Sequence, residues 1–453
     1  MEIKDFYNGR SILITGGSGF LGMVIIEKLL FSCDVKNIYM LMKPKKGKNV
    51  HERLESILNT QAFQRLNEKK PGEIKKIIPV VGDILEPNLG LKDADIKFLQ
   101  KEISVVFHAA ANINVDVSLI NAINVNTRGA QKMIELCKGM EQLSVFVYVS
   151  SAYSQSNKEI IDEIVYNTKC RLEAFNYVVD HLDGHALEKS VIGKFINGRP
   201  NTYTYSKALA EEIVSKELAE LPVAIIRPSI ITPSLKEPVR GWLYGWSGAN
   251  LVTLSCAKGT LRCWNGDPDA IVDIVPVDIV ANVTIAAAYD VFVNRDDQQH
   301  YNRKAKVFNC CSGLQNPLKL GHFLWGVADY GKQLFNRESV FSPKLMIIKW
   351  WILYAILSFF LQTVPAYFVN GLEYILGRKP RMMKFHKKIL ELGRVLGFFT
   401  LNQFLMTDYN VRELHLNLEK ADKETFNVDV SSINWDDYIK CYVVGLKAFL
   451  FDT

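Results

Sequence analysis

The chain has 453 residues, 48% of them hydrophobic, so it is long enough for two or three domains with a large core. Its net charge of +6 suits anionic small molecules or a membrane surface, is too small to indicate a nucleic-acid partner, and no aromatic-rich basic repeat supports one. Eight cysteines without a C-x-x-C pair favour neither a zinc site nor a disulfide framework, so we predict no metal site.

Residues 10 to about 230 alternate short apolar runs with helical patterns. The runs are nearly continuous, which is typical of strands buried on both faces of a parallel sheet, and helical segments between them give βαβ units. We therefore predict an α/β fold with a Rossmann-type doubly wound parallel sheet over residues 1–230. The expected strands are residues 11–15, 38–42, 77–82, 105–109, 145–149 and 223–227.

A glycine-rich turn follows the first expected strand and precedes a helix. Gly16, Gly19 and Gly22 have the spacing G-x-x-G-x-x-G. The first glycine allows a tight turn, the second lets the backbone approach a phosphate, and the third lets the helix pack on the strand. Backbone N–H groups at the helix start then bind a dinucleotide pyrophosphate. The expected cofactor-binding residues here are Thr15, Gly16, Gly19, Phe20, Leu21 and Gly22.

The end of the second expected strand indicates which dinucleotide binds. An NAD-selective fold places a carboxylate there for the ribose 2′-hydroxyl. This chain has Lys43 at that position, followed by Lys45, Lys46 and Lys48, and no carboxylate. Because cations suit a 2′-phosphate, the sequence favours NADPH, with Lys43 as the expected contact; the competing interpretation is a solvated basic loop.

Three further positions flank the expected cofactor site. Asp83, after the third strand, is placed to contact the adenine, and Ala109, after the fourth, is small enough to let the cofactor pass over the backbone. Asn126 is expected to hold the active-site backbone or a water. We expect His108 to pack or to hydrogen-bond locally rather than to catalyse.

Tyr203 and Lys207 are four residues apart and share one face of an expected helix. A tyrosine hydroxyl with a pKa near 10 is a poor acid–base group at neutral pH, and a nearby ammonium favours the phenolate and lowers that pKa. Lysine also suits the nicotinamide ribose hydroxyls. Tyr205 is a competitor, but Leu209 stands four residues after it and offers no charge. We therefore predict Tyr203 and Lys207 as a catalytic pair.

A third hydroxyl is expected to polarise the substrate oxygen. The strand at residues 145–149 ends in Ser150 and Ser151. A hydroxyl at the carboxyl end of a parallel strand faces the ligand crevice. We favour Ser151 as the catalytic hydroxyl and keep Ser150 as the alternative; either one also suits a strand-end cap.

Beyond residue 230 the character of the chain changes. Residues 231–340 are rich in Gly, Pro and Trp and are interpreted as a smaller substrate-binding lobe. Residues 345–369 carry one charge, Lys349, and a basic flank follows them. About 20 helical residues cross a bilayer, so this segment is predicted to associate with a membrane, by spanning it or by entering one leaflet; a buried or interfacial helix is the alternative. Residues 370–453 are predicted to form a helical C-terminal domain.

Several segments together resemble the extended short-chain dehydrogenase/reductases and, more specifically, the alcohol-forming fatty acyl-CoA reductases. The active-site segment GRPNTYTYSKALAE, residues 198–211, carries this resemblance most strongly. The others are residues 226–230 (IRPSI), 236–238 (KEP) and 273–278 (DIVPVD), and in the tail 398–402, 422–426 and 433–438.

The resemblance implies NADPH-dependent reduction of a long-chain acyl-CoA to a fatty alcohol by two hydride transfers, with release of coenzyme A. Tyr203 and Ser151 would stabilise and protonate the substrate oxygen, and Lys207 would lower the pKa of Tyr203. It further implies association with the endoplasmic reticulum or the peroxisome, with the catalytic part facing cytosol, and it is compatible with a homodimer. The absence of a signal peptide agrees with a cytosolic catalytic part.

This chain departs from the family pattern in two residues. Ser151 stands where many members have Thr, which keeps a hydroxyl. Lys43 replaces an Arg, so the phosphate would meet a point charge without a bidentate fork. The chain also ends without the C-terminal anchor of some members. Rival interpretations are an extended reductase for a sterol or a nucleotide sugar, and a catalytically silent binding protein on the same scaffold.

Overall fold

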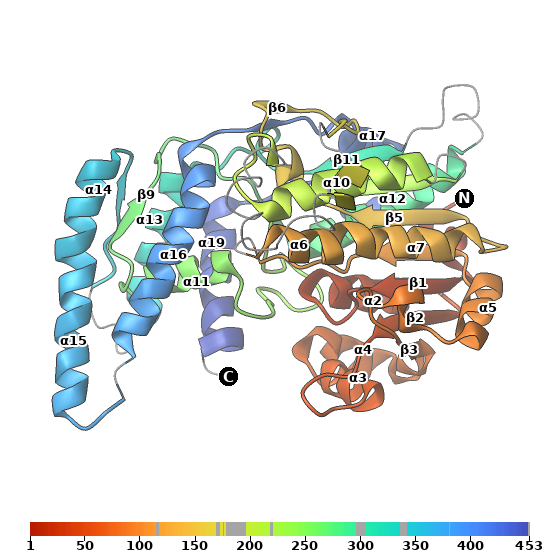
Figure 1. The fold of residues 1–453 in the computed structure, drawn as a ribbon, viewed down its shortest axis with the longest axis horizontal. Helices are drawn as coiled ribbons and strands as arrows, with labels where there is room; N and C mark the ends of the chain where they lie inside the picture. Colours follow the sequence, from red (N-terminus) through yellow and green to blue (C-terminus); the bar gives the residue numbers. More distant parts are fainter. Residues whose placement is uncertain are drawn as a thin grey trace. The chain divides into compact units, whose positions relative to one another are not determined.

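A seven-stranded parallel sheet is the centre of the computed structural model, which describes residues 1–114, 117–168, 173–174, 176–177, 196–217, 221–295, 305–335, 342–379 and 381–451. The strand order is β11-β7-β5-β4-β1-β2-β3 (Figure 1). The strands are β1 (Ser11–Thr15), β2 (Asn37–Met42), β3 (Ile77–Val81), β4 (Val105–His108), β5 (Val145–Val149), β7 (Val223–Pro228) and β11 (Lys306–Cys310). The predicted doubly wound α/β fold is confirmed.

Helices cover both faces of this sheet. Leu13, Val106 and Phe146, from neighbouring strands, join one apolar cluster with side chains of α5, α7 and α10, and Figure 1 shows α7 and α10 side by side. Helix α2 packs on α12, which also contacts β5 and β7. Successive strand side chains point to opposite faces, so a strand covered on both sides is apolar throughout. These helices are α2 (Phe20–Ser32), α5 (Asp93–Glu102), α7 (Gly129–Lys138), α10 (Thr202–Glu217) and α12 (Val277–Val293).

The strand register brings the candidate site residues to one edge of the sheet. Thr15 of β1 pairs with His108 of β4, and His108 pairs with Tyr148 of β5. Because the three strands are parallel, the segments that follow them leave the sheet at the same edge. These segments are the glycine turn, the turn after His108 and the Ser150–Ser151 turn.

Strand β11 lies within residues 231–340, the predicted substrate lobe. It pairs in parallel with β7, from Lys306 opposite Ala224 to Cys310 opposite Pro228. The compact units of the structure do not follow chain order: unit 1 is Met1–Val239, Val275–Cys311 and Met406–Asp429, and unit 2 is Arg240–Ile274, Ser312–Leu405 and Val430–Thr453. The domain boundaries stated above stay a prediction.

Unit 1 contains the sheet, its covering helices and a series of short elements. These are α1 (Ile3–Tyr7), α3 (Val50–Leu58), η1 (Gln61–Phe63), α4 (Gln64–Lys69), η2 (Pro71–Lys76), η3 (Pro87–Gly90), α6 (Leu119–Ala122), the π-helix η4 (Ile123–Arg128), η5 (Ala152–Gln155), β6 (Ile160–Ile161), β8 (Ile230–Thr232), α17 (Tyr409–Asn417) and α18 (Lys420–Thr425). The last two helices come from the tail. The Asp422 carboxylate of α18 accepts the Ile3 N–H at 2.9 Å, which ties this part of the tail to the first helix of the chain.

Unit 2 is mainly helical, as the predicted C-terminal helical region requires. Its elements are α11 (Gly248–Ala257), β9 (Cys263–Asn265), α13 (Leu320–Leu334), β12 (Met346–Ile348), α14 (Trp351–Ser358), η7 (Phe359–Thr363), α15 (Val364–Ile375), α16 (Met382–Leu401), α19 (Trp435–Leu446) and η8 (Lys447–Phe451). A Cβ on Gly445 would lie 2.0 Å from the Gly241 carbonyl oxygen, so α19 packs directly on the backbone where this unit begins. The short strands β10 (Ile274–Pro276) and β13 (Leu405–Met406) lie where the chain passes between units.

Candidate active site

The glycine turn between β1 and α2 is packed without room for side chains. Gly16 has a φ of +75°, and a Cβ there would lie 2.7 Å from the Ala109 carbonyl carbon. A Cβ on Gly22 would lie 2.2 Å from the Gly16 carbonyl oxygen. The N-cap residue of α2, Gly19, has no side chain to bind the N–H groups of the first turn. A bare helix N-terminus behind a tight turn fits a pyrophosphate, as predicted.

Thr15 and His108 fix the two strand ends to each other. Thr15 Oγ1 lies 2.7 Å from His108 Nδ1, and the Ala110 N–H donates to the same hydroxyl at 3.2 Å. His108 is fully buried and stacks on Tyr148. Burial, with a smaller contribution from the Lys207 ammonium, lowers the pKa of His108 to about 3, so its imidazole is neutral at physiological pH. Its place is that of a packed, locally bonded residue.

The lysines after β2 occupy an exposed hairpin. Lys45 and Lys48 exchange backbone hydrogen bonds of 3.1 Å, and Lys46 and Gly47 between them have positive φ. Lys43 stands apart, because its Nζ makes a 2.6 Å ion pair with Asp83 after β3. Burial alone would raise the pKa of Asp83, but the hydrogen bonds from Lys43 and from the Leu85 N–H lower it. The two residues assigned to the cofactor's adenosine end are therefore adjacent.

Sequence reasoning missed a guanidinium beside Lys43. Arg53, half-buried on α3, donates from Nη1 to the Lys43 carbonyl oxygen. Asn49 caps this helix, accepting the N–H groups of His51 and Glu52 at 2.9 and 3.0 Å. The Asn49–Glu52 capping box is a local signal that starts a helix soon after the basic loop and so brings Arg53 back to it. The guanidinium group that is absent at position 43 is supplied by Arg53 on the next helix.

Helix α10 places Tyr203 and Lys207 on one face, as predicted. Tyr203 and the Ser151 side chain are neighbours. Burial raises the pKa of Tyr203 to about 12, the neighbouring Ser151 side chain opposes this rise, and the Glu211 charge adds to it. Here the interaction that lowers the pKa comes from Ser151, rather than from the lysine that the sequence suggested. Tyr205, the competing tyrosine, is fully buried.

Lys207 is buried to 2% exposure and is held at the end of β5. Its Nζ donates to the Val149 carbonyl oxygen at 2.7 Å and lies 4.8 Å from the centre of the Tyr148 ring. Burial lowers the pKa of Lys207 to about 7, although the Glu211 carboxylate raises it. A lysine with this pKa changes its charge near neutral pH.

The two serines after β5 have different partners. Ser151 is the N-cap of η5 and accepts the Tyr153 N–H at 3.3 Å, and its side chain neighbours Tyr203. Ser150 donates instead to the buried Glu211 carboxylate at 2.5 Å. The hydroxyl next to the candidate catalytic tyrosine is therefore that of Ser151, while Ser150 faces a structural network.

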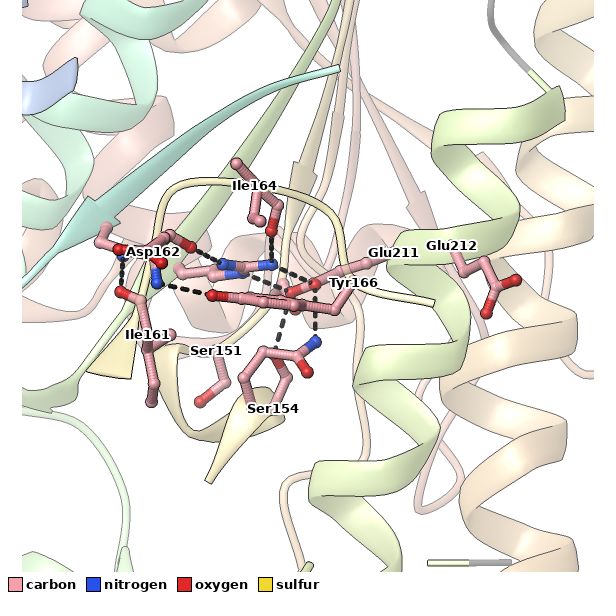
Figure 2. Close-up of polar contacts among 12 residues, drawn as sticks. Ser151, Ser154, Ile161, Asp162, Ile164, Tyr166, Glu211 and Glu212 are labelled. Carbon is pink, nitrogen blue, oxygen red and sulfur yellow. Dashed lines mark hydrogen bonds and ion pairs between the residues drawn. The ribbon is translucent and has the colours of Figure 1, made fainter. Parts of the chain in front are cut away.

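That network was not predicted. Glu211 reaches from α10 behind the serine turn, where its carboxylate accepts from Ser154 Oγ at 3.0 Å and from Gln155 Nε2 at 3.3 Å (Figure 2). Arg227 of β7 donates to it from Nε and Nη2 at 2.9 and 2.7 Å, and both side chains are wholly buried. Arg227 also bonds the carbonyl oxygens of Asp162 and Ile164. Glu211 follows Tyr203 and Lys207 at the same four-residue interval, which is the signal that could have identified it.

Asn126 lies in the π-helix η4, between α6 and α7. Its Oδ1 accepts the Asn112 N–H at 2.8 Å, and its Nδ2 donates to the Asn112 carbonyl oxygen at 3.2 Å and to Ser206 Oγ at 3.0 Å. The side chain therefore holds the backbone after β4 and the residue beside Lys207. Its place beside a bound cofactor stays a prediction.

The arrangement suits proton transfer beside a bound dinucleotide. The glycine turn and the Tyr203–Ser151–Lys207 group lie at the same edge of the sheet, and Tyr203 is protonated at neutral pH. Within the described ranges, no group of three or more His, Cys, Asp or Glu side chains is placed to hold a metal ion.

Two family models match this chain. An NAD-binding model and a C-terminal model, each described as male sterility protein, match residues 14–284 and 361–453. Fatty acyl-CoA reductase 1 of Mus musculus is 35% identical over the whole chain, which covers 87% of that protein. The Homo sapiens protein of the same name is 34% identical with the same coverage, and fatty acyl-CoA reductase wat of Drosophila melanogaster is 33% identical over 99% of the chain and 87% of its own length.

Solved structures share the fold at low sequence identity. The terminal R domain from the myxalamid PKS-NRPS biosynthetic pathway has a TM-score of 0.62 at 17% identity, covering 97% of this chain and 91% of its own. The reductase domain of a non-ribosomal peptide synthetase from Mycobacterium tuberculosis has a TM-score of 0.62 at 18% identity, covering 97% and 92%.

Proposed function

The chain belongs to the family of fatty acyl-CoA reductases and is an acyl-CoA reductase, and from that premise we propose that it converts long-chain fatty acyl-CoA to a primary alcohol. The proposed reaction uses two molecules of NADPH and releases coenzyme A. The observation that carries the proposal is the grouping of Tyr203, its neighbour Ser151 and Lys207, which donates to the end of β5, at the sheet edge where the glycine turn leaves β1.

The glycine turn supports dinucleotide binding. Side chains at Gly16 and Gly22 would collide with backbone, so only glycine allows the tight turn that cradles a phosphate. Lys43 and Arg53 support the choice of NADPH, since a 2′-phosphate would receive a point charge and a guanidinium fork together. Lys43 is paired with Asp83, so a 2′-phosphate would compete with that carboxylate for the ammonium. When bound, the cofactor supplies the hydride for each reduction.

Tyr203 suits the role of proton donor in a reduction. Hydride addition to a carbonyl leaves negative charge on oxygen, and a tyrosine with a pKa of about 12 is protonated when that charge develops. In this proposal the Ser151 hydroxyl donates a second hydrogen bond to the same oxygen. Lys207 is buried and donates to the Val149 carbonyl oxygen, and its proposed role is to hold the nicotinamide ribose hydroxyls.

The two reductions are proposed to share one site. The first converts the thioester carbonyl to a hemithioacetal, whose collapse breaks the carbon–sulfur bond and releases coenzyme A. The second reduces the resulting aldehyde to the alcohol, with Tyr203 again giving its proton to oxygen. Residues of this chain need only protonate and position in both steps.

The test uses full-length protein in detergent with NADPH and acyl-CoAs of different lengths, and mass spectrometry identifies the products. Fatty alcohol with two NADPH consumed per molecule supports the full proposal, and aldehyde alone would replace it with a single reduction. Tyr203→Phe should lose most turnover while still binding NADPH, and Tyr205→Phe is the matched control. Unchanged turnover in the Tyr203 variant would reject its assignment.

We also propose that the enzyme works at the cytosolic face of a membrane, either the endoplasmic reticulum or the peroxisome. One helix, Trp351–Ile375, is long and apolar enough by length and composition to cross a membrane. A long-chain acyl product is itself apolar, so release beside lipid avoids its exposure to water. Fractionation of cells that express a tagged full-length chain tests the location.

A further inference from the structure

Unit 2 has an unusually apolar outer surface on one long helix. The segments α14, η7 and α15 run without interruption over Trp351–Ile375. Soluble monomers rarely expose a large contiguous apolar patch. Here the exposed apolar side chains, which we call the apolar surface, are Trp350, Trp351, Ile352, Leu353, Ile356, Phe359, Phe360, Val364, Tyr367, Phe368, Leu372, Tyr374, Ile375 and Leu376.

The same helix has a buried side that is partly polar. Side chains four residues apart form this side, namely Tyr354, Ser358, Gln362 and Ala366. Gln362 Oε1 accepts the N–H groups of Arg262 and Cys263 at 3.0 and 3.3 Å, and its Nε2 donates to Ser358 Oγ at 2.8 Å. The helix therefore turns its polar stripe toward unit 2 and its apolar residues outward.

This arrangement opposes an isolated membrane span. A span surrounded by lipid would leave the Gln362 amide and its backbone partners in hydrocarbon without water, which is costly. A helix that lies along the membrane with its polar stripe on the protein presents only apolar side chains to the lipid. The structure therefore favours a helix that lies parallel to the membrane surface over a helix that spans the membrane.

The net charge of the chain is concentrated beside this surface. Residues 378–394, which we call the basic segment, contain seven Lys or Arg and one Glu, a net charge of +6 that equals the net charge of all 453 residues. Its cations are exposed and follow the end of α15 or lie on α16, which packs against α15: Arg378, Lys379, Arg381, Lys384, Lys387, Lys388 and Arg394. The rest of the chain therefore has a net charge of zero.

We propose that unit 2 docks on the surface of an anionic lipid bilayer, with the apolar surface in one leaflet and the basic segment at the headgroups. This inference rests on the membrane association proposed above, and it names the lipid charge and the mode of insertion. Apolar burial supplies the attachment, and the cations supply the preference for acidic lipids.

The first experiment is flotation of the full-length protein with phosphatidylcholine vesicles, with and without phosphatidylserine. Binding should be tighter with phosphatidylserine and should weaken as salt rises. The triple variant Lys384→Gln, Lys387→Gln and Lys388→Gln should bind acidic vesicles more weakly, by about fivefold for each cation removed. Its binding to phosphatidylcholine vesicles should not change. The matched control carries Lys92→Gln at the N-cap of α5 with Lys97→Gln and Lys101→Gln on α5, and it should bind like the parent protein.

A second pair of variants tests the apolar surface. Phe360→Ser with Phe368→Ser should abolish binding to both kinds of vesicle, while turnover of acyl-CoA in detergent is retained. The opposite result is a parent protein that binds no vesicle and is a dimer in detergent-free buffer, with the two substitutions making it monomeric. The apolar surface would then be a contact between two copies, and the proposal would be wrong.

A third measurement distinguishes docking from spanning. Seven cysteines in the described part of the chain are buried, so Lys349→Cys and Lys379→Cys introduce accessible thiols at the two ends of the helix. On sealed vesicles, a membrane-impermeant maleimide should label both. Protection of one thiol until detergent is added would show a span and overturn the proposal, while leaving membrane association intact. Equal binding to both vesicle compositions would overturn the headgroup preference. The vesicle-binding and labelling readouts do not require the proposed reaction.

Discussion

The Glu211 carboxylate and the Arg227 guanidinium form a wholly buried ion pair of 2.7 Å directly behind the serine turn of the candidate active site. Hydrogen bonds from Ser150, Ser154 and Gln155 converge on the same carboxylate, so one side chain fixes the turn that carries Ser151. Glu211 also raises the pKa of Lys207 and contributes to the raised pKa of Tyr203. It is a positioning residue that also sets the electrostatics of the site.

Glu211→Gln should therefore change the pH profile as well as the stability. Loss of its negative charge lowers the pKa of Lys207 further, so the alkaline limb of the kcat/KM profile should move to lower pH. Breaking a buried ion pair costs about 3–5 kcal/mol of unfolding free energy, so thermal unfolding is measured alongside. Glu212→Gln on the next residue is the control. A variant with lower stability and an unmoved pH profile would leave Glu211 with a structural role only.

Ser151→Ala and Ser150→Ala should separate catalysis from stability. Removing a hydrogen-bond donor to a developing oxyanion lowers kcat by about 10²–10³-fold, so Ser151→Ala should show that loss. Ser150→Ala removes one of the donors to buried Glu211 and should cost about 1–3 kcal/mol of unfolding free energy with a smaller change in kcat. Steady-state kinetics and chemical denaturation of both variants provide the comparison. The reverse pattern would make Ser150 the catalytic hydroxyl.

The sheet was predictable because most of its strands are local apolar runs bounded by turns. Residues 11–15 and 145–149 match β1 and β5 as expected. Strand β11 was missed because Lys306–Cys310 contains a lysine and an asparagine, which interrupt the apolar run. Only its pairing with β7, about 80 residues earlier in the chain, makes it part of the sheet. Such a partner is set by tertiary structure, which local periodicity does not contain.

The candidate site divides in the same way. Tyr203 and Lys207 were found because a four-residue interval on a helix is a local signal, and Ser151 because strand ends face the crevice. The buried partner of Glu211 lies on a different element, and so does the carbonyl oxygen that Arg53 contacts. The expected direction of the Tyr203 pKa was wrong for a related reason. Burial, which spacing does not reveal, outweighs the effect of a neighbouring charge.

Lys43→Ala and Arg53→Ala should each weaken selection for NADPH over NADH. A charge-assisted hydrogen bond contributes about 1.5–3 kcal/mol, so the KM for NADPH should rise by about tenfold or more while the KM for NADH changes little. Asp83→Asn should act oppositely on NADPH, because it frees the Lys43 ammonium from its ion pair. Lys46→Ala, in the exposed hairpin, is the control. Equal losses with both cofactors would show that these cations do not contact the 2′-phosphate.

His108 should make the fold sensitive to acid. Its pKa is about 3 in the folded protein and about 6.5 when unfolded, so the unfolded chain binds more protons between these values. The free energy of unfolding therefore falls as the pH drops from 6.5 toward 3. At pH 5, His108 accounts for about 2 kcal/mol of this loss. His108→Gln keeps a hydrogen-bonding group near Thr15 but has no charge to gain. Denaturant unfolding at pH 7 and pH 5 should show a smaller acid loss for the variant than for the parent, with His51→Gln on the exposed start of α3 as control. An equal loss in parent and variant would place the acid sensitivity elsewhere in the chain.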